Sequence, residues 1–266
     1  MGSGLTKRAG SATLHGMNIA IASYSFHGLV GNKTMDVFGY LEACRHRYDL
    51  RSADIWNGMI PNLEKGFLAQ LREGLREREL ELANLCVDGP HLWEDDAAVR
   101  DEHHRGALAW LKAAEYLGAR TIRIDAGVRA KTFSKVQFDY IVKRYREYAK
   151  IAHNAGFRVG PENHWGAEVE PANMRRICEA VNHPGFGVLL HFKGAGEAQF
   201  AKWAMHTHIS WDIVTGDLGK SLAMLRDKAY RGYWSVEHHS GKREYSEVAI
   251  QVAKVRDVVA GWAEKG

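Results

Sequence analysis

The stretch WLKAAEYLGARTIRIDAG, residues 110 to 127, contains the unit from which the fold can be predicted. It begins with a segment typical of a helix, reaches Gly118, and runs directly into a strand expected over 120 to 125. The phrase AGFR at 155 to 158 repeats the order of helix end, glycine and strand start that LGAR shows at 117 to 120. Strands that alternate with helices in this way favour parallel strands joined by crossover helices.

Eight such units can be counted along the chain. Its 266 residues are enough for one (β/α)8 barrel, which needs roughly 250. We therefore expect an α/β fold with a single (β/α)8 TIM barrel as the catalytic domain over residues 17 to 266. An open doubly wound sheet is the alternative, but no glycine-rich phosphate loop follows any expected strand. The strands are expected at 18–26, 50–56, 82–87, 120–125, 157–162, 187–191, 204–210 and 233–238.

Composition places the chain among soluble globular proteins, with 45% hydrophobic and 26% charged residues. Residues 1 to 16, MGSGLTKRAGSATLHG, contain no apolar run and are expected to be a disordered or tag-derived tail. No segment is apolar enough to predict a membrane span. Three widely spaced cysteines without a CxxC pair favour a reducing cytoplasm. The net charge of +4 is spread along the chain, which argues against a nucleic-acid partner.

Polar side chains gather at the ends of the last four expected strands. In a barrel these ends converge on one mouth, and residues two apart along a strand point the same way. Four successive strands therefore direct carboxylates and imidazoles at one region. The residues that share these faces are Gly160, Glu162 and His164; Leu189 and His191; His206, His208 and Ser210; and Ser235, Glu237 and His239.

This combination of residue types indicates a metal site. Carboxylates and neutral imidazoles are ligands that Mn²⁺, Fe²⁺, Co²⁺ and Zn²⁺ accept, and clustering them without an ion would leave costly buried charge. Any one of these histidines, taken alone, is more commonly an ordinary core or rim side chain. Four strands together favour a shared divalent ion.

Several segments resemble the xylose isomerase-like superfamily of sugar phosphate isomerases and epimerases, which also includes the type-IV (AP endonuclease 2) repair enzymes. The resemblance covers most of the chain from about residue 17. It lies in WLKAAEYLGARTIRIDAG (110 to 127), VGPENHWG (159 to 166), FGVLLHFKG (186 to 194), MHTHIS (205 to 210) and YRGYWSVEHHSG (230 to 241).

The resemblance implies one metal held by Glu162, His191, His208 and Glu237. It further implies that Glu162 and Glu237 are the catalytic pair that moves protons. His191 stands where the family expects aspartate, and His239 stands where many relatives have a second glutamate. An imidazole in place of the aspartate removes one negative charge, which should shift preference from Mn²⁺ or Mg²⁺ towards Fe²⁺, Co²⁺ or Zn²⁺.

The implied activity is isomerisation or epimerisation of a sugar or keto-sugar by proton transfer next to a metal-bound carbonyl. His164 and His206 are expected to contact substrate hydroxyls or to support the ligands. The carbohydrate substrate is the expected partner, and homo-oligomer formation stays open. The other candidate substrate-binding residues are Lys193, Asp125, Arg123, Trp56, Trp165, Trp211 and His239.

Three other functions fit the same residues. A metal-dependent lyase or hydrolase of 3-keto-glycosides would use the same proton abstraction. An abasic-site endonuclease would need further ligands, for which His91 is the one evident candidate. A non-catalytic sugar-binding barrel would have lost its metal.

Overall fold

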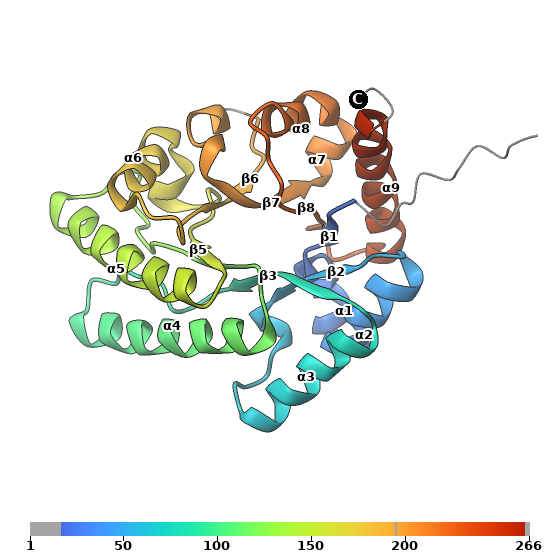
Figure 1. Ribbon diagram of the computed structural model, residues 1–266, viewed down its shortest axis with the longest axis horizontal. Coiled ribbons are helices and arrows are strands. Elements are labelled where there is room, and N and C mark those ends of the chain that lie inside the picture. Colours follow the sequence, from blue (N-terminus) through green and yellow to red (C-terminus); the bar gives the residue numbers. More distant parts are fainter. Residues whose placement is uncertain (1–16, 195, 264–266) are drawn as a thin grey trace, which may run out of the picture.

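Eight parallel strands form the wall of a barrel at the centre of the molecule, and the helices lie around it (Figure 1). A computed structural model describes residues 17–194 and 196–263, so the expected tail at 1 to 16 lies outside the described residues. The strands are β1 (Ile19–Ile21), β2 (Ser52–Trp56), β3 (Glu81–Val87), β4 (Thr121–Ile124), β5 (Arg158–Gly160), β6 (Val188–His191), β7 (Ala204–Ser210) and β8 (Trp234–Glu237).

The barrel closes through two joints between four-stranded sheets. One sheet has the order β2-β3-β4-β5 and the other β1-β8-β7-β6. A parallel bridge from Ala22 to Asp54 joins β1 to β2, and bridges from Val159 to Phe186 and from Glu162 to Leu189 join β5 to β6. Each strand thus has a neighbour on both sides. The predicted TIM barrel is confirmed.

The expected strands match the observed ones in place, but several are one or two residues shorter, and the first and fifth lose more. After Ile21 the chain turns into the 3-10 helix η2 (Ser23–Phe26), so the first strand ends before Phe26. β5 ends at Gly160 because Pro161 follows, and proline has no backbone N–H to donate to a ladder. Glu162 nonetheless stays beside β6 through its bridge to Leu189.

The crossover helices have clear start and stop signals. Asp96 accepts hydrogen bonds from the backbone at the start of α4, and Ser134 forms a capping box with Gln137 at the start of α5. Gly118 ends α4 in the left-handed conformation. The helices are α1 (His27–Gly31), α2 (Val37–Glu42), α3 (Lys65–Glu77), α4 (Ala97–Leu117), α5 (Lys135–Asn154), α6 (Pro171–Val181), α7 (Trp211–Thr215), α8 (Leu218–Arg226) and α9 (Glu244–Ala263).

The apolar stripes of α5 and α9 pack against the barrel strands. Ile141, Tyr145 and Tyr148 of α5 are buried, and so are Val248 and Val252 of α9. Burial of this kind supplies most of the free energy that holds amphipathic helices in place. Among the described residues, no helix has the length and apolar character needed to cross a bilayer.

Gly160 lies where two strands approach too closely for a side chain. A Cβ at this position would lie 1.7 Å from the carbonyl oxygen of Gly187, in the neighbouring strand segment. Because this contact is with backbone, rotating a side chain cannot relieve it. We expect Gly160→Ala to lower the free energy of unfolding by about 3 kcal/mol or more, measured by urea denaturation.

The control for this prediction is Gly66→Ala in α3, where a Cβ would meet nothing within 4 Å. Alanine is the better helix former by about 1 kcal/mol, so this variant should be as stable as the parent or slightly more stable. A Gly160→Ala protein with the parent's urea midpoint would contradict the close approach of β5 and β6.

Candidate metal centre

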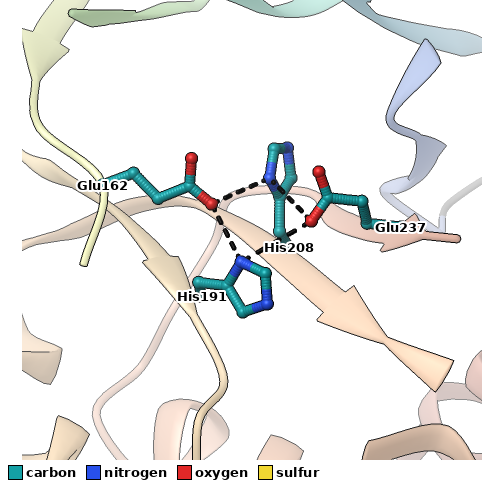
Figure 2. A group of neighbouring side chains, drawn as sticks. All are labelled: Glu162, His191, His208 and Glu237. Carbon is teal, nitrogen blue, oxygen red and sulfur yellow. Dashed lines mark hydrogen bonds and ion pairs between the residues drawn. The ribbon is translucent and has the colours of Figure 1, made fainter. Parts of the chain in front are cut away.

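Four side chains from four successive strands meet at the carboxyl-terminal mouth of the barrel (Figure 2). Glu162 Oε1 lies 3.0 Å from His191 Nδ1 and 3.1 Å from His208 Nδ1. Glu237 Oε2 lies 3.5 Å from each of the same two nitrogens. One ligand atom from each residue therefore falls within 4.8 Å of all the others. The structure brings together the four residues that sequence reasoning selected as ligands.

The backbone around Glu162 and His191 is fixed by its neighbours. The Glu162 N–H donates to Asp125 Oδ1 at 3.0 Å. Asn163 forms two bonds with the backbone of His191, accepting from its N–H at 2.7 Å and donating to its carbonyl at 2.8 Å. Asn163 was not singled out from the sequence, although it lies within the quoted ENH segment.

All four residues are at least 93% buried, with Glu237 the most accessible at 7%. Burial raises the pKa of Glu237, but His208, His239 and His191 outweigh it and lower the pKa to about 2. The pKa of Glu162 is also well below its usual range, because His164 and His208 outweigh its burial. Both carboxylates are thus ionised, as metal ligands must be.

The donor set fits a divalent ion. Burial lowers the pKa of His208, but Glu237, Glu162 and Asp54 outweigh it and raise the pKa well above the usual range. Both nitrogens of His208 face carboxylate oxygens, so without an ion each of them would need a proton to donate. Glu237 Oε2 has no well-aligned hydrogen bond within the described residues. An ion would take the place of the Nδ1 protons and satisfy this oxygen.

Asp54 supports His208 from inside the barrel and is fully buried. Its Oδ2 accepts hydrogen bonds from His206 Nε2 at 2.8 Å, His208 Nε2 at 3.0 Å and Ser235 Oγ at 2.8 Å. Its Oδ1 accepts from Asn84 Nδ2 at 2.8 Å. Asp54, His206 and His208 also have the spacing of a metal site. The donors around the carboxylate favour a hydrogen-bonded support instead, since a hydrogen bond fixes which imidazole nitrogen faces a metal.

A cavity of about 320 Å³ opens above the four residues. Five of the candidate substrate-binding side chains line it, namely Trp56, Arg123, His164, Lys193 and His239. Tyr24, Cys86 and Asp88 also line it and were missed by sequence reasoning, because each lies on an early strand end or loop without a distinctive motif.

The remaining candidates lie elsewhere. His206 and Asp125 are fully buried beneath the mouth. Trp165 lies outside the cavity lining and donates from Nε1 to Asp125 Oδ2 at 3.0 Å. Trp211 also lies outside it and packs edge-on against His238 with ring centroids 6.1 Å apart. These four residues thus contact other groups of the protein and do not line the cavity.

Arg123 neutralises the carboxylates at the floor of the cavity. Its Nη1 donates to Asp125 at 3.0 Å and to Asp88 at 2.7 Å, and its Nε lies 3.3 Å from Glu162 Oε2. Its Nη2 lies 2.7 Å from Cys86 Sγ. A buried guanidinium paired on several sides costs much less than an unpaired one. Arg123 and Asp125, both expected as substrate-binding candidates, thus form a salt bridge with each other.

Comparison with known proteins is consistent with this geometry. The family model described as "Xylose isomerase-like TIM barrel" matches residues 38–255. No curated protein matches the chain at the level of sequence.

Three solved structures illustrate the similarity of fold. The 3-keto-D-glucoside 4-epimerase YcjR from E. coli has a TM-score of 0.68 and 17% identity, covering 94% of this chain and 100% of its own. A probable 3-DHS dehydratase from Bacillus anthracis has a TM-score of 0.67 and 15% identity, covering 92% and 99%. A xylose isomerase-like TIM barrel protein from Mycobacterium smegmatis, in complex with magnesium, has a TM-score of 0.69 and 14% identity, covering 93% and 98%.

Proposed function

The chain belongs to the xylose isomerase-like TIM barrel family, and from this premise we propose that it is a divalent-metal-dependent isomerase or epimerase of a sugar or keto-sugar. The observation that carries the proposal is the pair of buried, ionised carboxylates, Glu162 and Glu237, which face the same two imidazole nitrogens from the ends of β5 and β8. Such a pair suits proton transfer on either side of one reacting carbon.

We assign Glu162, His191, His208 and Glu237 as the residues that would hold the ion. With two carboxylates and two neutral imidazoles the ligand charge is −2, which balances a divalent cation. Fe²⁺, Co²⁺, Zn²⁺ and Mn²⁺ accept this mixed set. An ion bound there would polarise a carbonyl or hydroxyl of the substrate.

The two carboxylates divide their oxygens between two tasks in this proposal. Glu162 Oε1 and Glu237 Oε2 are the atoms near the imidazoles. This leaves Glu162 Oε2 and Glu237 Oε1 to accept or return the proton of the carbon beside the carbonyl. His164 Nδ1 lies 3.2 Å from Glu162 Oε2, and His239 Nε2 lies 3.1 Å from Glu237 Oε2. Each carboxylate thus has an imidazole through which protons can exchange with water.

The cavity suits a small polar ligand with one apolar face. Its volume lies at the lower end of the usual range for small-molecule sites. Trp56 is anchored by a hydrogen bond from Nε1 to Asp88 Oδ2 at 2.7 Å. An anchored indole offers a rigid surface on which a sugar ring can stack. Lys193 and His239 line the same cavity and would supply hydrogen bonds to hydroxyls.

A lyase or hydrolase of 3-keto-glycosides is the second candidate, and a specific observation favours it. His239 is exposed, its Nε2 lies 3.1 Å from Glu237 Oε2, and this carboxylate raises its pKa. A protonated imidazole there could donate to a departing glycosidic oxygen. By contrast, His91 does not line the cavity and packs against Trp165, which gives the endonuclease no further ligand there.

The test of the function is solvent deuterium exchange. The protein is purified without chelators, its metal content is checked by elemental analysis, and it is incubated in D₂O with a panel of ketoses and 3-keto-glycosides. We expect NMR to show deuterium at the carbon beside the carbonyl in at least one of these compounds. Chelator treatment should stop the exchange and one of the four metals should restore it. A new epimer supports the first proposal, whereas release of free sugar without epimers supports the second. If the protein is isolated without metal and shows no deuterium exchange after metal is added, the non-catalytic sugar-binding barrel is the interpretation that remains.

A further inference from the structure

A cavity of about 640 Å³ lies at the opposite end of the barrel from the candidate metal centre. Its lining comes from the amino-terminal ends of the strands. Arg158 begins β5, Ala204 begins β7, Thr121 begins β4, and Tyr233 immediately precedes β8. The proposed reaction does not use this end of the barrel.

The charge of this cavity is strongly positive. Five basic side chains line it, namely Arg120, Arg158, Lys202, Lys228 and Arg231, against the single acid Glu81. Glu81 is already engaged, since Arg120 Nη2 donates to it at 2.9 Å and the Tyr233 hydroxyl donates to its other oxygen. Within the described part of the chain, no ion pair joins the other four cations to a carboxylate. Four positive charges therefore face one concave space without a counter-charge.

Arg158 is the fixed member of this group. It is half-buried, and its guanidinium is held by the carbonyl oxygens of Phe186 at 2.9 Å and Trp203 at 3.3 Å. Gly187 leaves the room it needs, because a Cβ there would lie 2.6 Å from Arg158 Nη2. Burial lowers the pKa of Arg158, since its charge is partly removed from water. An anion in the cavity would offset this cost.

We propose that this basal cavity, lined by Arg120, Arg158, Lys202, Lys228 and Arg231, binds a small polyanion that carries two or more phosphate or carboxylate groups. Nε and Nη2 of Arg158 are bound to the two carbonyl oxygens, so the guanidinium is held in place and presents Nη1 to one anionic group. Lys202 lies just before β7, and Lys228 and Arg231 lie before β8, where they can reach a second group. The volume exceeds what one phosphate needs. This binding is independent of the metal centre.

The test is calorimetric titration of the full chain with pyrophosphate and, separately, citrate, at matched ionic strength. The variant Lys228→Gln/Arg231→Gln removes two exposed cations from the cavity. Its control, Lys65→Gln/Lys112→Gln, removes two exposed lysines from α3 and α4. We expect saturable one-to-one binding to the parent, at least tenfold weaker binding to the cavity variant, and less than a twofold change in the control.

Pyrophosphate and citrate also chelate metal ions, but the heat of chelation at the candidate metal centre would be the same in the parent, the cavity variant and the control variant. Equal affinity in parent and cavity variant would therefore overturn the proposal, as would the lack of saturable binding of both anions to the parent. Binding of pyrophosphate alone would assign the cavity to phosphates, and binding of citrate alone would assign it to carboxylates.

Discussion

Replacing Glu237 by glutamine is expected to lower turnover by about a thousandfold or more and to weaken metal binding severely. The amide keeps the shape of the side chain but removes the charge that balances the ion. It also cannot accept a proton, so the proposed acid–base pair loses one member, which alone contributes about 10²–10⁴-fold. Both losses follow from the replacement of one carboxylate oxygen by an NH₂ group.

The measurements are metal affinity, by competition with a chromophoric chelator, and the rate of deuterium exchange. Glu179→Gln is the control, because Glu179 is an exposed residue of α6 that pairs with Arg175 at 3.2 Å, away from the mouth. The control should match the parent in both measurements. If Glu237→Gln retains a rate within about tenfold of the parent, or about 1.4 kcal/mol of barrier, its assignment as a catalytic ligand is wrong.

The residues at the mouth of the barrel could be predicted because side chains alternate between the two faces of a strand, so the sequence alone gives the face on which each residue lies. Glu162 and His191 could be assigned to one mouth from their positions at strand ends, since parallel strands bring these ends together. This rule and the residue types indicated the region, and the resemblance then selected the four ligand candidates from the side chains that share these faces. The change from aspartate to His191 was visible through the resemblance, and the structure shows that its Nδ1 faces the two carboxylates.

The supporting residues could not be predicted in the same way. Asp54 lies in the middle of β2, within an ordinary strand sequence, and its partners His206 and His208 are more than 150 residues away along the chain. Alternation gives the face of a strand but not the depth at which a side chain meets another strand. For that reason the sequence suggested two roles for His206, and only the closed barrel shows it beneath the ligands.

The tryptophans illustrate a similar limit. Trp56, Trp165 and Trp211 all lie near strand ends, yet Trp56 alone of the three lines the cavity at the mouth. The direction of an indole after a strand end depends on the loop that follows. Trp165 turns back to donate a hydrogen bond to Asp125, and Trp211 begins α7 against His238. Loop geometry of this kind has no short sequence signal.

Asp54→Ala is expected to destabilise the fold and to weaken metal binding together. Four donors, from His206, His208, Ser235 and Asn84, would lose their acceptor in a fully buried space. We expect a loss of about 3–5 kcal/mol in the free energy of unfolding, as found when one partner of a buried charged group is removed. Metal affinity should fall by about 10–100-fold, because nothing would hold the His208 Nε2 proton in place.

Asp54→Asn separates the charge of the carboxylate from its shape. The amide oxygen can stay in the place of Oδ2 and accept from His208. The NH₂ group of the new asparagine then faces Asn84, so the Asn84 amide must turn over to accept from it. This is possible because Thr121 Oγ1 lies 2.8 Å from Asn84 Oδ1 and can accept a hydrogen bond as well as donate one. Most of the hydrogen bonds survive, so Asp54→Asn should be clearly more stable to urea than Asp54→Ala. Its metal affinity should still fall by about tenfold, since a neutral amide makes the imidazole a weaker ligand. Parent-like metal affinity in both variants would show that Asp54 stabilises the barrel without orienting His208.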